Sequence, residues 1–448
     1  MTTKTAGNKE SGVSGQAIII AVIAAIGGLL FGYDTSVISG AILFVRHQFA
    51  LSSFATELAV SIVLAGAALG AAVAGYFTDR FGRRPVLVVN AIIFGIFAVV
   101  TGLSNGLALF LAARFLVGIA IGVTSMVTPL YIAELAPTAI RGALVTLNQL
   151  AIVTGIVVAY YVDYLFSGSA DWRAMFISAV IPSILLLVAL IFLPESPRWL
   201  AARSRYDEAL GVLRRVESAS EARRNLDELR RITEADQLKF WDLFAVRFRK
   251  PLLIGVGLAI FQQITGVNTI IYYTPTILQM AGYKSASSAL LATVLVGGVN
   301  LVATIVSLFL LDRVGRRPLL LIGIVGMFLG LGHLGYSMGV GHISRGAVLL
   351  DVLGYLAAFA ISMGPIFWLL ISEIYPTTIR GQAMSLASVT IWVADLVVSI
   401  TFLSLVGALG ARYAFWLYGL ACVAAFIFSW MLVPETKDKT LEQIEASW

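Results

Sequence analysis

Long apolar stretches separated by short polar loops dominate the chain. We find about twelve stretches of roughly 20 apolar residues, the length that crosses the hydrocarbon core of a bilayer. In the first half they cover Ala17–Leu43, Glu57–Phe77, Val86–Leu103, Leu107–Leu130, Ala143–Val162 and Met175–Leu193. In the second half they cover Leu252–Met280, Ser288–Leu311, Leu319–Met338, Ala347–Ile371, Ala383–Val406 and Tyr413–Val433. Because the runs are continuous and not alternating, and lipid offers backbone amides no partner, the pattern predicts membrane-spanning α-helices.

Composition supports this class. Hydrophobic residues make up 59% of the 448, charged residues 12%, and the mean hydropathy is +0.91, all outside the range of soluble domains. We therefore predict an all-α, multi-pass membrane protein whose first span is retained, since it is too long for a cleaved signal peptide. The single cysteine, Cys422, excludes a disulfide framework. The sequence lacks a phosphate-binding loop, an HExxH motif and metal-spaced histidines, which argues against an enzyme, an ATP-driven pump or a metal cofactor.

Lysine and arginine are unevenly distributed between the loops. When the N-terminus is placed in the cytoplasm, most of them fall in cytoplasmic loops, and the opposite side carries only Arg46, Arg173, Lys284, Arg345 and Arg412. The positive-inside rule then predicts that both termini are cytoplasmic. The protein itself is expected to lie in the cell membrane. The formal net charge of +6 reflects this bias, so it does not indicate a nucleic-acid partner.

Three motifs occur twice at nearly the same spacing. DRFGRRP (79–85) returns as DRVGRRP (312–318), ELAPTAIRG (134–142) as EIYPTTIRG (373–381), and PESPR (194–198) as PETKD (434–438). The repetition predicts two half-length modules. We expect a six-helix bundle over 1–193, a cytoplasmic linker over 194–250, a second six-helix bundle over 251–436 and a cytoplasmic tail over 437–448. Helix-spaced apolar residues in the linker predict short amphipathic helices beneath the bundles.

Two opposite charges are expected inside the membrane, Asp34 in the first span and Arg114 in the fourth. A charge in lipid costs roughly 2.5–3.5 kcal/mol even on insertion scales, so each is a candidate functional residue. An aspartate facing arginine ionises easily, whereas one in a dry cavity without that partner keeps its proton. The pair is therefore a candidate for coupling proton binding to conformation, and a static ion pair that fixes helix packing is the alternative.

Amide side chains are concentrated in the seventh span, FQQITGVNTIIYYTP (261–275). Such groups need partners at membrane depth, and together with amides elsewhere they suit a neutral, polyhydroxylated ligand. The candidates are Gln149, Gln262, Gln263, Asn268 and Asn300, with Trp368 and Trp392 as apolar faces. Gly266 and Pro275 should weaken this helix, which is tolerated where backbone lines a cavity. Packing roles for single amides and tryptophans remain the alternative. A third intramembrane charge, Asp395, has no evident partner.

The ordered set of motifs resembles the sugar porter family of the major facilitator superfamily over essentially the whole chain. The motifs are GYDTSVISGA, DRFGRRP, ARFLVGIAIG, ELAPTAIRG, PESPRWL, QQITGVNTIIYYTP, DRVGRRP, GPIFWLLISEIYPTTIRG and PET. The resemblance implies two six-helix bundles around a midplane site. It also implies that the seven amide and tryptophan residues named above contact a monosaccharide, with Phe31 as a wall of the site. The family's proton-coupled members carry aspartate at the position of Asp34, with Arg114 as its partner. Many members have asparagine where this chain has Asp395, which leaves the substrate open.

The resemblance also implies how the chain closes at each side. Tyr272 and Tyr273 would help close the outside, and a bend at Gly364 and Pro365 would close the inside. A cytoplasmic salt-bridge network would hold the inner ends together when the site faces outward. Its members would be Arg83, Arg84, Glu134, Arg141 and Glu195 in one half, and Arg316, Arg317, Glu373, Arg380 and Glu435 in the other.

The sequence thus predicts a functional monomer in the bilayer that imports a monosaccharide with a proton by alternating access. Alternatives are a proton-independent sugar facilitator, a symporter of myo-inositol or another polyol, and, from another class, a non-transporting sugar sensor. The short C-terminal tail argues against the sensor, because it offers no signalling domain. The identity of the sugar and the proton stoichiometry stay open.

Overall fold

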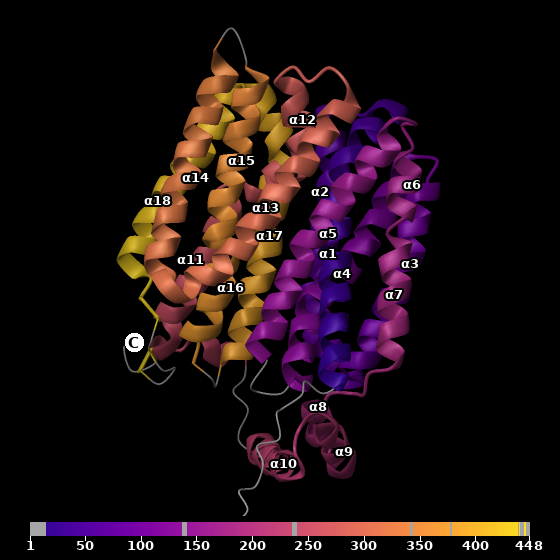
Figure 1. The fold of residues 1–448 in the computed structure, drawn as a ribbon, viewed down its shortest axis with the longest axis vertical. Helices are drawn as coiled ribbons and strands as arrows, with labels where there is room; N and C mark the ends of the chain where they lie inside the picture. Colours follow the sequence, from indigo (N-terminus) through magenta and orange to yellow (C-terminus); the bar gives the residue numbers. More distant parts are fainter. Residues whose placement is uncertain are drawn as a thin grey trace, which may run out of the picture.

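The chain folds into two helical bundles that stand side by side (Figure 1). This computed structural model describes residues 15–136, 141–234, 240–340, 344–376, 379–437, 439, 443 and 444, without the side chains of 15–19, 21–24, 141–146, 232–234, 240 and 312. Within these residues, 12 helical spans are long and apolar enough to cross a membrane. The predicted all-α, twelve-span architecture is therefore confirmed.

The first bundle contains six spans, the last of them in two pieces. Its helices are α1 (Gly15–Gln48), α2 (Ser53–Phe81), α3 (Arg83–Leu103), α4 (Leu107–Leu135), α5 (Arg141–Ser167), α6 (Trp172–Ile177) and α7 (Val180–Ile191). The second bundle comprises α11 (Arg249–Ile264), α12 (Val267–Met280), α13 (Ala286–Val314), α14 (Arg316–Gly339), α15 (Arg345–Ile361), α16 (Met363–Ile374), α17 (Arg380–Leu409) and α18 (Ala411–Leu432).

Three spans are interrupted, each for a local reason. Gly266 adopts φ 91° between α11 and α12, a left-handed conformation that favours glycine, so the predicted weak point is confirmed. Pro275, in contrast, lies inside α12 without ending it. Pro365 removes the amide that would donate to Ile361, and α15 ends there. Pro182 acts in the same way on Ser178 between α6 and α7, a break that the sequence analysis missed.

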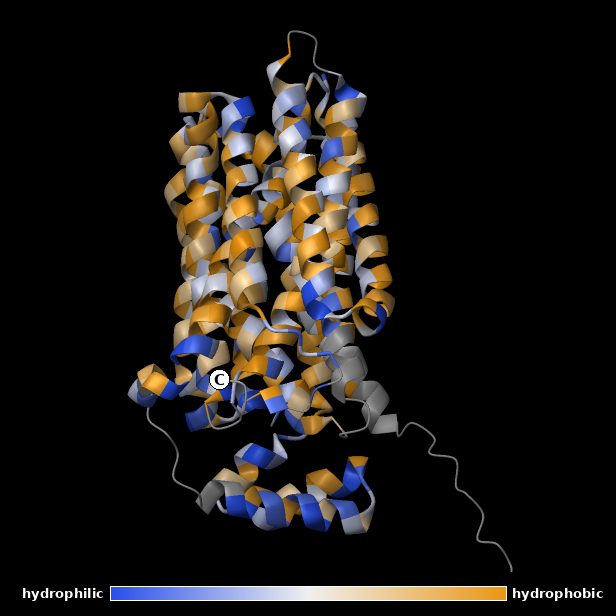
Figure 2. Ribbon diagram, turned by 90° about the vertical axis from the view of Figure 1, so that its left-hand side faces the viewer, coloured by the Kyte–Doolittle hydropathy of each residue, from blue (hydrophilic) through white to orange (hydrophobic). Residues whose placement is uncertain are grey.

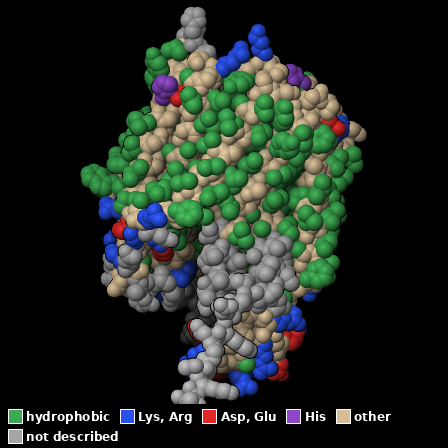
Figure 3. Space-filling model, viewed as in Figure 1, with side chains coloured by type: hydrophobic (Ala, Val, Ile, Leu, Met, Phe, Trp, Pro, Cys, Tyr) green, Lys and Arg blue, Asp and Glu red, His purple; other side chains and the backbone are tan. Residues whose placement is uncertain are grey.

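Short helices between the bundles lie beyond one end of the spans, which we call the linker end; the opposite end is the far end (Figure 1). They are α8 (Pro197–Ala202), α9 (Tyr206–Val216) and α10 (Ala219–Glu234), followed by the 3-10 turns η1 (Phe240–Phe244) and η2 (Val246–Phe248). Figure 2 shows that hydrophilic residues are frequent on these helices, whereas hydrophobic residues dominate the spans. Figure 3 likewise shows hydrophobic side chains over the flank of the bundles and charged ones towards their ends.

The bundles meet along three helix pairs, α2 with α17, α5 with α13 and α1 with α12. Near the far end, Glu57 on α2 accepts two hydrogen bonds from Ser404 on α17, one from its backbone amide and one from its hydroxyl, both at 2.6 Å. Ser167 on α5 bonds Ser287 on α13 at 2.8 Å. Deeper in the interface, the Tyr160 hydroxyl donates to the Ile271 carbonyl at 2.8 Å. These contacts hold the far ends of the bundles together.

The duplicated DRxGRRP motifs form the same tight turn in each bundle. Gly82 and Gly315 adopt φ 99° and 97°, between α2 and α3 and between α13 and α14. The carboxylate of Glu195 accepts from the backbone amides of Arg83 at 3.0 Å and Arg84 at 3.2 Å, and so caps the start of α3. Glu435 caps α14 in the same way, at 3.1 Å from the amides of Arg316 and Arg317. In each bundle the glycine of the turn and the capping glutamate thus form one structural unit, which occurs once per half of the chain.

We expect Gly82→Ala to destabilise the protein by about 1–3 kcal/mol, because alanine does not readily adopt this φ and its Cβ would overlap the Glu195 carboxylate. Gly75→Ala is the matched control, since a Cβ there, within α2, meets nothing within 4 Å. Thermal unfolding in detergent should show a lower midpoint for the first variant only. Equal midpoints would contradict this account of the turn.

Candidate functional site

Asp34 and Arg114 form an ion pair in the core of the first bundle. Asp34 lies midway along α1 and Arg114 in the first half of α4, and their side chains are 1% and 0% exposed. Nη1 of Arg114 lies 2.9 Å from both carboxylate oxygens of Asp34. The guanidinium carbon also lies 5.2 Å from the centre of the Phe176 ring on α6. The predicted meeting of these two charges is thus present in the structure.

The pair leaves donors of Arg114 unused. Within the described residues, its Nε and Nη2 are buried without a hydrogen-bond partner. Unpaired buried donors are costly, so Arg114 is not satisfied by this single arrangement. Among the described residues Asp34 is the one ionic partner of Arg114, so a change in the charge of Asp34 would leave Arg114 without a counter-charge there. Asp34 and Arg114 therefore compensate each other's charge in the core of the first bundle.

An amide cluster lies at the break between α11 and α12 in the second bundle. Gln262 donates to the carbonyl of Met363 at 3.3 Å, and Gln263 donates to the amide oxygen of Gln262 at 3.4 Å. Asn268, two residues beyond Gly266, donates to the amide oxygen of Gln263 at 2.9 Å. The left-handed glycine turns the chain so that side chains from two short helices meet, which brings three of the predicted site residues together.

Asp395, on α17, completes this cluster. One of its oxygens accepts from the amide of Asn268 at 2.8 Å and from the hydroxyl of Tyr272 at 3.0 Å. The other accepts from the hydroxyl of Ser399 at 3.0 Å. The side chain is buried and has no ion pair within the described residues. The partner of Asp395 that was not evident from the sequence is therefore a set of neutral donors.

Aromatic rings close one side of this region. Phe31 on α1 and Trp392 on α17 pack edge to face with ring centres 5.6 Å apart, which links the two bundles. Trp392 is 6% exposed, whereas Trp368 on α16 is 37% exposed and packs against Phe367. The remaining predicted contacts lie on helices of the bundle interface, Gln149 on α5 and Asn300, buried, on α13.

The predicted gating residues lie within α12 and at the start of α16. Tyr272 and Tyr273 are buried on α12, and the hydroxyl of Tyr273 donates to the Ser399 carbonyl at 3.2 Å. Gly364 and Pro365 lie at the start of α16, immediately after the interruption at Ser362. Gly364 and Pro365 thus follow a helix break, whereas Tyr272 and Tyr273 lie on a continuous helix that contacts α1 of the first bundle.

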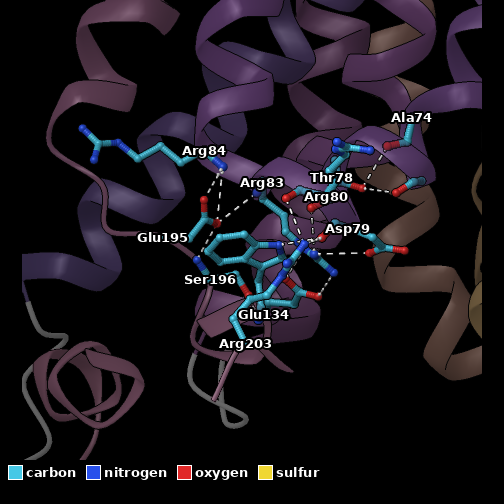
Figure 4. A network of polar contacts seen from close by, with 12 residues as sticks. Ala74, Thr78, Asp79, Arg80, Arg83, Arg84, Glu134, Glu195, Ser196 and Arg203 are labelled. Carbon is cyan, nitrogen blue, oxygen red and sulfur yellow. Dashed lines mark hydrogen bonds and ion pairs between the residues drawn. The ribbon is translucent and has the colours of Figure 1, made fainter. Parts of the chain in front are cut away.

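Residues of the predicted salt-bridge network at the linker end form ion pairs within each bundle, and Figure 4 shows those of the first bundle. Arg83 pairs with Glu134 through two bonds at 3.0 and 3.2 Å, and Arg316 pairs with Glu373 at 3.3 Å. The side chains of Arg84 and Arg317 donate here to backbone carbonyls, those of Leu190 and Ile191 for Arg84 and that of Trp430 for Arg317. Their part in a network of the outward-facing state stays a prediction.

The other residues of the predicted network whose side chains the structure describes make hydrogen bonds with the backbone. Arg380 donates to the Tyr375 carbonyl at 3.2 Å, and the side chain of Arg141 lies outside the described residues. Glu195 and Glu435 serve mainly as helix caps. Burial raises the pKa of Glu195, and amide hydrogen bonds and the charge of Arg83 offset part of this effect.

Sequence reasoning missed two buried acids, Glu57 and Asp163, both 0% exposed. The predicted fifth span ended at Val162, which placed Asp163 in a loop, whereas α5 continues to Ser167. Glu57 began the predicted second span and was not considered as a charge within it. Counting acids over the full helices would have found both. No cluster of metal-ligating side chains occurs among the described residues.

The chain matches a known protein family over almost its whole length. A model of the family "Sugar (and other) transporter" matches residues 20–448. The chain belongs to the sugar porter family of the major facilitator superfamily. Among members of the family, the galactose-proton symporter of Escherichia coli is 39% identical, over 98% of this chain and 96% of its own length. The D-xylose transporter of Levilactobacillus brevis is 41% identical, over 94% of both chains.

Solved structures of family members superpose on nearly the whole chain. The xylose transporter of Escherichia coli in a partially occluded inward-open conformation gives a TM-score of 0.84 at 36% identity, covering 95% of this chain and 100% of that one. A proton:xylose symporter bound to 6-bromo-6-deoxy-D-glucose gives 0.81 at 36% identity, covering 96% and 99%.

We expect Asp395→Ala to destabilise the second bundle by at least about 1–3 kcal/mol, because it leaves buried donors of Asn268, Tyr272 and Ser399 without an acceptor. Asp395→Asn should cost much less, since its oxygen still accepts and its amide can donate to the Ser399 hydroxyl. Thermal unfolding of both variants tests this expectation, and it is wrong if they unfold at the same temperature.

Proposed function

We propose that this protein is a secondary active transporter that imports a monosaccharide together with a proton by alternating access. The observation that carries the proposal is the buried Asp34–Arg114 pair beside an interface lined with amides. The names of the relatives support the same reading, because several are proton symporters of galactose or arabinose. The protein moves substrate and does no covalent chemistry in this proposal.

The sugar site in this proposal lies between the bundles at mid-membrane depth. Amides of the second bundle bind hydroxyl groups of the sugar, because each amide both donates and accepts hydrogen bonds. The members of this group are Gln262, Gln263, Asn268 and Asn300, with Gln149 from the first bundle. Phe31, Trp392 and Trp368 cover the apolar faces of the ring. Asp395 orients Asn268 through the bond at 2.8 Å.

The transport cycle follows from the charge of Asp34. With the far ends open, Asp34 takes a proton from outside and is released from Arg114. Sugar then binds, and the bundles rock about the midplane. At the inner side Asp34 loses the proton and pairs again with Arg114, the arrangement seen here at 2.9 Å. Sugar and proton must together favour opening to the inside, since otherwise the proton gradient would leak.

Orientation and assembly belong to the proposal as well. We infer that the linker end faces the cytoplasm, since lysine and arginine are concentrated there, and that the far end faces outward. The protein then lies in the cell membrane as a functional monomer with both termini inside. Tyr272 and Tyr273 close the outer side, and the bend at Gly364 and Pro365 closes the inner side. The salt-bridge network, Arg141 included, steadies the inner ends when the site faces outward.

The relatives' names do not decide the substrate of this chain. Galactose, arabinose and xylose differ by single hydroxyl positions or one hydroxymethyl group, and myo-inositol offers the same hydrogen-bonding groups. A thermal-shift screen with monosaccharides and polyols would identify the ligand that stabilises the protein most. Binding without uptake or counterflow would favour a sensor.

Asp34→Asn should abolish uphill accumulation of the sugar in proteoliposomes and leave counterflow intact. The neutral amide keeps the shape of the side chain but can no longer gain and lose a proton. Wild-type protein under the same pH gradient is the reference. Undiminished accumulation by the variant would establish a facilitator or place the coupling elsewhere.

Gln262→Ala should weaken sugar affinity about two- to tenfold, since a lost neutral hydrogen bond is worth roughly 0.5–1.5 kcal/mol. Gln279→Ala is the matched control, because Gln279 lies on the same span near the far end and outside the cluster. Binding titrations of both variants compare them directly. Equal affinities would remove Gln262 from the site.

A further inference from the structure

Asp163, near the far end of α5, is a fully buried carboxylic acid with a single hydrogen bond. The backbone amide of Gly40 on α1 donates to Oδ2 at 3.0 Å, and Oδ1 has no partner. Glycine at position 40 allows this approach, since a Cβ there would lie 2.5 Å from the Asp163 side chain. Asp34, by comparison, has a charged partner, and Asp395 has three donors.

Asp163 lies on the face of α5 that packs against α1, where its side chain contacts Gly40. Tyr160 and Ser167, three residues before it and four residues after it, lie beside it on the helix. Tyr160 bonds Ile271 on one side of Asp163 and Ser167 bonds Ser287 on the other. Both bonds join the bundles near the far end. When the far ends separate these bonds must break, and the second bundle no longer covers α1 and α5 on either side of Asp163.

No cation balances Asp163 where it lies. Within the described residues it has no ion pair, and Tyr33 on α1 and Tyr160 on its own helix are the titratable groups that interact with it electrostatically. Tyr33 interacts with Asp34 as well. The neighbouring helices contribute the following further ionisable groups to this part of the protein: Asp34 from α1, Arg114 from α4 and Tyr272 from α12.

An ionised carboxylate with one neutral donor is strongly disfavoured in a dry protein interior. We propose that Asp163 is a second proton-binding site, and that the far ends close over it only when its carboxyl group has taken a proton from the outer solution. The step is a simple proton transfer that changes the carboxyl group from charge −1 to neutral. Closure of the outer gate is then itself linked to protons.

This inference rests on the proposed function and extends it. Gly40 lies six residues beyond Asp34 along α1, so Asp163 lies about 9 Å nearer the outside than the ion pair. Protons from outside therefore meet Asp163 first. A gate that closes only over a protonated acid prevents the site from being sealed without the coupling ion.

The test measures the distance between the far ends of the bundles as pH changes, with no sugar present. Spin labels on Ser53→Cys and Leu409→Cys report it, because both positions are exposed and the native Cys422 is buried. In the otherwise wild-type protein, acidic solution should favour the short distance and alkaline solution the long one. In Asp163→Asn the short distance should persist at alkaline pH.

Two further variants sharpen the result. Glu57→Gln is the matched control, since it removes another buried acid of the same interface and should leave the pH-dependent lengthening in place. Asp163→Glu retains a carboxyl group and should restore the dependence. If Asp163→Asn does not fold, Asp163→Ser removes the titratable group in its place.

The inference would be overturned if the distance between the labels depended on pH in the same way with Asp163 and with Asp163→Asn. It would also be overturned if the pH dependence were lost in Glu57→Gln and kept in Asp163→Asn. The proposed function is tested separately, by sugar-driven proton movement in the wild-type protein. If that movement occurs and Asp163→Asn leaves the distance profile unchanged, only the second proton site is wrong. If no proton movement occurs, the symport proposal fails whatever the distances show.

Discussion

The cost of a charge in the membrane interior is the constraint on which the functional part of this structure depends. Each buried acid meets it in a different way. Asp34 has a guanidinium, Asp395 has three neutral donors, Glu57 has two donors from one serine, and Asp163 has a single amide. Protonation of any of these acids changes the charge that its partners compensate, so the protonation state can favour one conformation over another. A transporter driven by protons can use this sensitivity.

The duplicated halves separate scaffold from chemistry. Both bundles repeat a left-handed glycine, an arginine-rich helix start and a capping glutamate at the linker end. Neither the Asp34–Arg114 pair nor the amide cluster around Asn268 is repeated. The first bundle thus carries the charged pair, the second carries most of the polar groups suited to a sugar, and rocking of one bundle against the other can couple them.

Much of the fold and part of the candidate site were predictable from the sequence, because hydropathy and motif order are strong signals in a membrane protein. The twelve spans, the glycine break at Gly266 and the meeting of Asp34 with Arg114 followed from the sequence. The break at Ser178 did not, because Pro182 was not treated as a helix interruption. Asp163 was missed because the predicted fifth span ended at Val162, where the apolar run ends, whereas the helix continues to Ser167. The carbonyl partners of Arg84 depend on how α7 ends beside α3, which no local pattern specifies.

Sugar-driven proton movement tests the central claim most directly. Purified wild-type protein is reconstituted into lightly buffered liposomes with a pH indicator inside, and an outward-to-inward gradient of the identified sugar is applied with no initial pH gradient. Proton-coupled import predicts that the lumen becomes more acidic as sugar enters, and that a protonophore abolishes the signal. Sugar uptake with no change in internal pH would contradict the account.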